Sequence, residues 1–119
     1  MPRDPLGVTL RLHAGDAIAM GPGKADLLAG IAEAGSIAAA ARAMGLSYRR
    51  AWAMVETMNY NFAAPLVAAT KGGGGGGGTV LTPEGAAVLA DYRAMVAAAQ
   101  AAAAPVAERL RARLRDSKG

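Results

Sequence analysis

The sequence predicts a mainly α-helical fold with a small β component (α+β): a winged helix-turn-helix with an N-terminal β-hairpin and a long C-terminal helix. Three observations support this fold class. Two helical segments are joined by a tight turn at Gly45, a glycine-rich hairpin follows them, and Thr82-Pro83-Glu84 then begins another helix. A short helix joined by such a turn to a longer one is the pattern of a helix-turn-helix, and a β-hairpin after the pair is typical of a wing.

The N-terminal segment is predicted to form a hairpin and a first helix. Val8–His13 alternates apolar and polar residues as a strand does, Ala14–Asp16 favours a turn, and Ala17–Met20 can return as the second strand. Lys24–Ala34 has apolar residues at helical spacing and is followed by Gly35, which suits a helix end. The expected core residues of this helix are Leu27, Leu28 and Ile31.

The next two helices form the predicted helix-turn-helix. Ser36 is a good N-cap for a helix over Ile37–Met44, and Ser47 for a helix over about Tyr48–Phe62. Gly45 permits the left-handed turn between them. Spacing predicts that the longer helix buries one stripe, which comprises Ala51, Trp52, Val55, Met58 and Phe62.

The wing and the last helix complete the chain. Short strands are expected at Leu66–Thr70 and Thr79–Leu81, with seven consecutive glycines between them that suit a wing tip or, less simply, an anion-binding nest. Pro83 begins a helix that Pro105 should kink or break. The predicted domains are residues 1–82, a winged helix-turn-helix with its wing at 66–82, and residues 83–119, a dimerisation helix with a basic tail.

Composition excludes several classes of function. With no Cys and a single His, the chain has neither disulfides nor a thiolate or two-histidine metal site. We expect no cofactor, and because the acids are isolated we expect no enzyme activity. No segment is long and apolar enough for a membrane span or a signal peptide, which predicts a cytoplasmic protein without a membrane partner.

The charge favours a polyanionic partner. The net charge is +4 with a pI near 10.0, and residues 106–119 hold five basic and two acidic groups. This tail suits either a phosphate-binding arm or a solvated helix end, where cations complement the helix dipole.

The candidate DNA-binding residues gather at the start of the longer helix of the pair. A helix N-terminus attracts phosphate, and arginine offers a planar fork of donors that matches guanine or backbone oxygens. Tyr48 and Ser47 can donate to phosphates. Taken alone, an arginine pair of this kind also fits an ordinary solvated helix face. The full candidate set is Ser36, Ser47, Tyr48, Arg49, Arg50 and Lys71.

An ordered series of motifs resembles one known family. The series comprises Gly21-Pro22-Gly23, Gly35-Ser36-Ile37, Ala39-Ala40-Ala41, Ser47-Tyr48-Arg49-Arg50-Ala51-Trp52, Pro65-Leu66-Val67, the glycine-rich wing and Leu81-Thr82-Pro83-Glu84-Gly85. Over roughly residues 8–95 it resembles the N-terminal DNA-binding domain of molybdate-responsive, ModE-type transcription regulators, which is related to LysR-type winged helices. The resemblance implies a homodimer on double-stranded DNA with a palindromic operator. It also implies that the helix from Pro83 pairs with its twin, and that Trp52 is a packing residue.

One departure from the family limits what carries over. ModE-type regulators usually continue into molybdate-binding domains, and this sequence stops at Gly119 without them. We therefore expect no molybdate sensing, and the effector is unknown. Two alternatives remain open: a winged-helix module that binds another protein, and a regulator with an oxyanion or soft-metal effector at its dimer interface.

Overall fold

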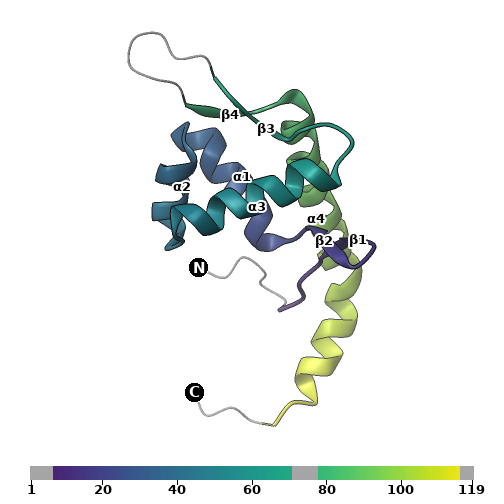
Figure 1. Cartoon of the computed structure of the whole chain (residues 1–119). Helices are drawn as coiled ribbons and strands as arrows, with labels where there is room; N and C mark the ends of the chain where they lie inside the picture. The colour runs from purple at the N-terminus through teal and green to yellow at the C-terminus, as the bar shows by residue number, and fades with distance from the viewer. Residues whose placement is uncertain (1–6, 71–77, 116–119) are drawn as a thin grey trace.

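The computed structural model describes residues 7–70 and 78–115, which form a winged helix-turn-helix with a long C-terminal helix (Figure 1). In chain order the elements are β1 (Leu12–Ala14), β2 (Ala17–Met20), α1 (Pro22–Ala34), α2 (Ile37–Met44), α3 (Tyr48–Asn61), β3 (Val67–Ala69), β4 (Thr79–Leu81) and α4 (Pro83–Ala112). The predicted α+β class is confirmed. No helix among these residues is long and apolar enough to cross a membrane.

The core lies where α1 packs against α2, α3 and the first turns of α4. Its largest fully buried side chains are Met20, Leu27, Leu28, Ile31, Met58 and Leu66. Small residues let α1 and α2 approach closely, because a Cβ added at Gly30 would lie 3.1 Å from the Cβ of Ala40. The three core residues predicted for α1 are therefore confirmed.

The turn of the helix-turn-helix depends on glycine. Gly45 has a φ of 72°, in the left-handed region, and its backbone N–H bonds to the end of α2. The chain can therefore reverse there and begin α3 three residues later, which confirms the predicted turn.

The N-terminal hairpin is shorter than predicted. Its first strand covers Leu12–Ala14 instead of Val8–His13, and the pairing register shifts between Leu12 and His13. Residues 8–10 lie beside α4, where the Tyr92 hydroxyl donates a 2.8 Å hydrogen bond to the Leu10 carbonyl. This segment is therefore held by a helix far away in the sequence, a contact that strand periodicity does not encode.

The wing is a two-stranded antiparallel hairpin in which Val67 pairs with Leu81. Thr79 N–H donates to the Gly35 carbonyl at 2.8 Å, so β4 is attached to the corner between α1 and α2. Lys71 and most of the glycine run lie outside the described residues. The predicted wing tip and the alternative nest therefore both stay predictions.

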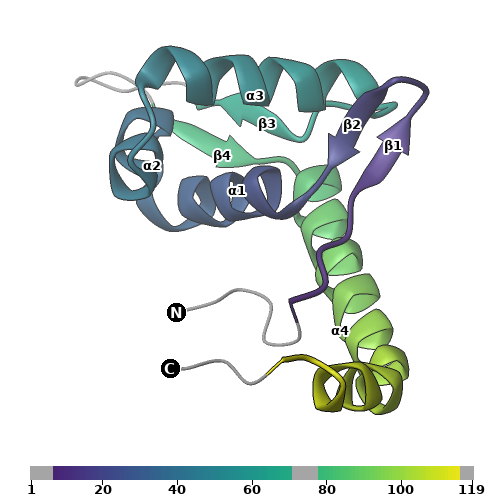
Figure 2. The same cartoon turned by 90° about the horizontal axis from the view of Figure 1, so that it is seen from below.

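The last helix, α4, is 30 residues long and passes through Pro105 without a break. Figure 2 shows that its final turns lie at an angle to the turns nearest the core. Of the two predicted outcomes at Pro105, a kink or a break, the change of direction agrees with the kink, because proline lacks a backbone N–H. Gly85, Leu89 and Tyr92 bury the start of α4 against the core.

Candidate nucleic-acid interface

The N-terminal end of α3 is capped and faces solvent. The Ser47 hydroxyl accepts a 3.1 Å hydrogen bond from the Arg50 backbone N–H, which confirms the predicted cap. The side chains of Tyr48, Arg49 and Arg50 are all exposed. Four of the six candidate residues therefore share one helix turn with a positive helix end and two guanidinium groups.

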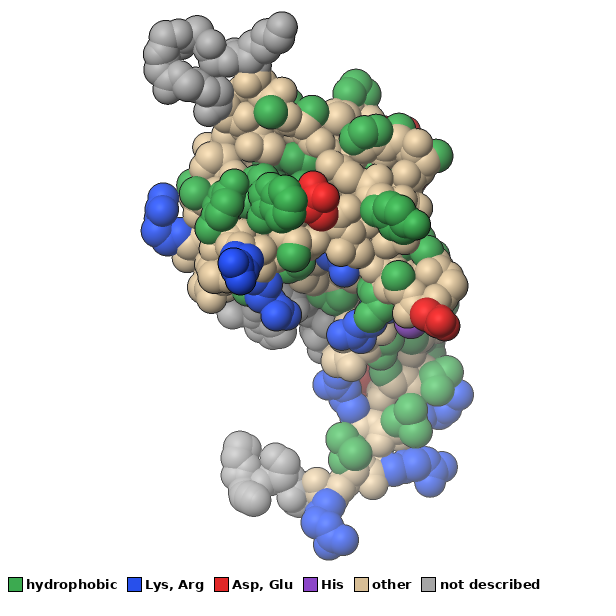
Figure 3. All heavy atoms as spheres, viewed as in Figure 1, with side chains coloured by type: hydrophobic (Ala, Val, Ile, Leu, Met, Phe, Trp, Pro, Cys, Tyr) green, Lys and Arg blue, Asp and Glu red, His purple; other side chains and the backbone are tan. Residues whose placement is uncertain are grey.

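The outer face of α3 extends beyond that first turn. Successive residues of a helix are about 100° apart around its axis. Arg49, Trp52, Glu56 and Tyr60 consequently lie within about 80° of one another, outside the arc of the buried Ala51, Val55 and Met58, and all four are exposed. Figure 3 shows hydrophobic side chains gathered over α3, with basic side chains bordering them towards its N-terminal end.

Trp52 corrects the sequence prediction. It was expected in the buried stripe of α3, but its side chain is 47% exposed, and Tyr48 one turn earlier is 55% exposed. The core beside α3 is filled by Ala51, Val55 and Met58, which face α1, α2 and β2. Trp52 lies about 100° around the helix from Ala51 and about 60° from Val55, so it borders the buried side without belonging to it.

Ser36 does not lie on this face of α3. The Ser36 hydroxyl caps α2 by accepting a 3.0 Å hydrogen bond from the Ala39 backbone N–H. Its neighbour Gly35 carries the base of the wing through the Thr79 hydrogen bond. Ser36 is thus next to the wing, whereas Lys71 lies outside the described residues and its role stays a prediction.

Asn59 connects α3 to the wing and was missed by sequence reasoning. Its side-chain oxygen accepts hydrogen bonds from the backbone N–H groups of Leu66 at 2.8 Å and Val67 at 3.2 Å. Its amide nitrogen donates to the Val67 carbonyl at 3.2 Å. The one signal in the sequence is a polar residue next to the core position Met58, which by itself predicts no partner.

Thr82 completes the connection between the wing and α4. Its hydroxyl donates to the Pro65 carbonyl at 2.7 Å and accepts from the Gly85 backbone N–H at 2.9 Å. A Cβ at Gly85 would collide with the Leu66 carbonyl oxygen, so glycine is required there. The wing is therefore fixed to α1, α3 and α4 at its base.

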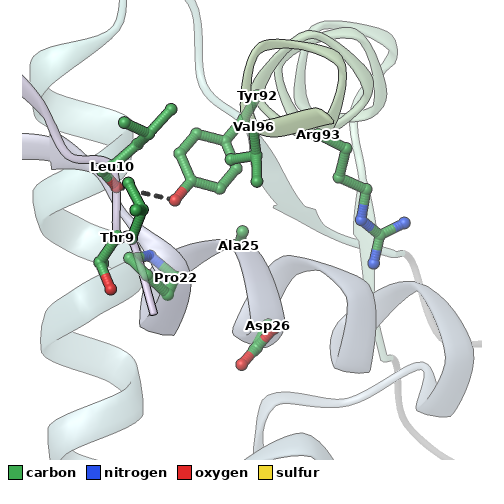
Figure 4. Close-up of a pocket in the computed structure, with 9 residues that line it drawn as sticks. Thr9, Leu10, Pro22, Ala25, Asp26, Tyr92, Arg93 and Val96 are labelled. Atoms are coloured by element: carbon green, nitrogen blue, oxygen red, sulfur yellow. Dashed lines mark hydrogen bonds between the residues drawn. The ribbon is translucent and has the colours of Figure 1, made fainter. Parts of the chain in front are cut away.

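Two hollows lie beside α4, away from the outer face of α3. One, of about 220 Å³, is lined by Leu12, Met20, Phe62, Val88, Asp91, Tyr92 and Met95. The other, of about 150 Å³, separates Tyr92, Arg93 and Val96 on α4 from Pro22, Ala25 and Asp26 on α1, with Thr9 and Leu10 at its edge (Figure 4). Both linings are mainly apolar.

Burial lowers the pKa of Lys24, which lies on α1 and not on the outer face of α3. Within residues 7–70 and 78–115, no three acidic or histidine side chains are grouped so that they could hold a metal ion.

Comparison with known proteins assigns this geometry to a family. The model of the bacterial regulatory helix-turn-helix proteins of the lysR family matches residues 24–86, which include α1 to α3, the wing and the start of α4. The chain belongs to the lysR family. Residues 24–86 therefore form a helix-turn-helix domain of the kind found in these regulatory proteins.

The chain is also similar to three proteins named for molybdenum. It is 53% identical over 78 residues to the molybdenum-pterin-binding protein MopB and 40% identical over 92 residues to MopA, both from Rhodobacter capsulatus. It is 41% identical over 84 residues to the molybdenum transport protein ModE of Azotobacter vinelandii. The matches cover 66%, 77% and 71% of this chain, in the order given, but only 29%, 35% and 31% of the relatives. The predicted resemblance to a ModE-type DNA-binding domain is thereby confirmed.

Proposed function

We propose that this chain is a sequence-specific transcriptional regulator that binds an inverted-repeat operator as a homodimer. The observation that carries the proposal is the exposed N-terminal turn of α3, where a capped helix end coincides with Arg49 and Arg50. These arginines can each form two hydrogen bonds to the O6 and N7 atoms of a guanine in the major groove. The lysR-family match supports the same reading of the helix pair.

Groups that can contact phosphate would position α3 on the DNA duplex. The Ser47 oxygen accepts from Arg50 N–H, which leaves its own hydroxyl hydrogen free to donate to a phosphate oxygen. The exposed Tyr48 hydroxyl has the same capacity. Because the wing is fixed to α3 through Asn59, the base of the wing keeps a constant position relative to the groove in which α3 lies. Lys71 is proposed as a phosphate contact of that wing.

Dimerisation is supported by an apolar surface on one side of α4. At about 100° per residue, Val88, Met95, Val106 and Leu110 lie on the same side of the helix, and the last three have exposed side chains. The 220 Å³ hollow opens beside Val88 and Met95. A second copy would remove this stripe from water, and the burial of apolar area is the main driving force of association. We therefore divide the chain into a DNA-reading part, residues 1–82, and a dimerisation helix with a basic tail, residues 83–119.

A two-fold dimer implies a two-fold operator. Two α3 helices related by the dimer axis must meet the same face of the duplex, so the half-sites should lie about 34 Å apart or a multiple of this. The experiment is selection of bound sequences from a random DNA pool, followed by footprinting. An inverted repeat is the expected result, and a single asymmetric site would contradict the dimeric mode of binding.

Docking to another protein is the second candidate, and the exposed end of α4 favours it. Leu110 is 60% exposed and Leu114 71% exposed, in a segment that also carries several arginines. Salt separates the two functions. Contacts to phosphate weaken steeply as salt rises because counterions are released from DNA, whereas an apolar docking surface is insensitive to salt.

A further inference from the structure

We propose that Trp52 recognises the methyl group of a thymine in the operator and so determines part of the sequence specificity. This inference rests on the DNA-binding function proposed above. The arginine pair supplies only polar contacts to DNA, and Trp52 would add an apolar contact.

The first argument is the position of Trp52 on α3. It lies three residues after Arg49 on the outer face, and its indole is 47% exposed. It belongs neither to the buried core nor to the partly buried residues that pack against it. About half of this large side chain is therefore exposed, outside the packed core.

The second argument is the chemistry of the major groove. Stacked bases present only their edges there, and the main apolar feature of those edges is the C5 methyl group of thymine. Tyr48 carries a hydroxyl that suits phosphate, whereas the indole is mostly apolar and therefore suits the methyl group. A thymine contact would also shield the indole from water.

The third argument is the spacing along the helix. Three residues of an α-helix rise about 4.5 Å, and adjacent base pairs of DNA are about 3.4 Å apart. With α3 lying along the groove, the thymine that contacts Trp52 should be within about two base pairs of the guanine read by Arg49. Tyr60, 87% exposed, is eight residues further along and about 12 Å away on this axis.

The test removes single methyl groups from the DNA. Each thymine of the selected operator is replaced in turn by uracil, which lacks only the C5 methyl group, and affinity is measured by fluorescence anisotropy. For the parent protein, replacement at one thymine in each half-site should weaken binding about fourfold, the effect of leaving one methyl group unburied. Trp52→Ala should lose this sensitivity, and the matched control Tyr60→Ala should keep it.

A second measurement needs no variant. The chain has a single Trp, so 5-bromouracil placed at the sensitive thymine and irradiated in the complex should crosslink to Trp52, as located by mass spectrometry. If uracil affects Trp52→Ala as it does the parent, or the crosslink forms elsewhere, the inference is wrong while DNA recognition stands. If the parent selects no sequence from the pool, the proposed function itself is wrong.

Discussion

Arg49 and Arg50 show how far local sequence determines a binding residue. Their exposure follows from helix periodicity, because both lie on turns whose inward positions are taken by Ala51 and Val55. The Ser47 cap bonds to the backbone of Arg50 and not to its side chain. Either side chain can therefore be changed without loss of the cap.

Replacing both arginines by alanine should abolish sequence-specific binding and leave the fold intact. A bidentate contact to a guanine is worth about 1–3 kcal/mol, so each single variant should bind its operator about 5- to 150-fold more weakly. Anisotropy titration measures the affinity, and thermal unfolding checks the fold. Arg93→Ala, an exposed arginine on α4, is the control and should select the same operator as the parent. Unchanged affinity in the double variant would contradict the assignment of α3 as the recognition helix.

At the level of secondary-structure elements, the strands of the wing are too short to be stable alone. β3 and β4 have three residues each, and their position depends on hydrogen bonds to Gly35, Asn59 and Thr82. Asn59 lies in α3, whereas Gly35 ends α1 and Thr82 caps the start of α4. The wing therefore keeps its orientation only while those helices stay packed together.

Replacing Asn59 by alanine should lower the free energy of unfolding by about 1–3 kcal/mol, since the backbone groups of Leu66 and Val67 lose their partner. Operator affinity should fall as well, because the wing would no longer be fixed to α3. Asn61→Ala is the matched control. The Asn61 amide donates a single hydrogen bond to the Thr57 carbonyl in the same helix, so its loss should affect DNA binding little. Denaturant unfolding and anisotropy are the measurements, and equal effects of the two variants would refute the wing-anchoring role.

At the scale of the whole molecule, α4 gives the chain an extended shape. The principal extents are 59 × 32 × 23 Å, and Figure 1 shows the C-terminal turns of α4 projecting beyond the core. A helix that leaves an apolar stripe exposed over such a length is poorly stabilised by its own chain. Pairing with a second copy would bury that stripe.

We expect a homodimer at micromolar concentration and a shift to monomer when Leu110 is replaced by glutamate. Burial of an unpaired carboxylate in an apolar interface is strongly unfavourable. Ala101→Glu places the same charge on an exposed position on the opposite side of α4 and should remain dimeric. Sedimentation velocity distinguishes the two. A monomeric parent protein at this concentration would contradict both the dimer and the palindromic operator.

Local signals in the sequence determined most of the secondary structure. Ser36 and Gly45 bound α2 at the predicted residues, and Thr82 with Pro83 begins α4 as expected. Each signal acts through a cap or a permitted backbone angle within a few residues, so it needs no knowledge of the rest of the fold. The order of these elements was enough to predict the winged helix-turn-helix.

The tertiary structure alone decided which surfaces are covered. Periodicity placed Trp52 in the buried stripe, but the elements that pack on α3 leave it 47% exposed. The Val8–His13 strand was shortened because Leu10 bonds to Tyr92, and Asn59 became the link to the wing because β3 lies beside it. These outcomes depend on contacts between residues distant in the sequence. The energies of these contacts depend on which elements pack together. The spacing of hydrophobic residues along one element does not specify which other elements will pack against it.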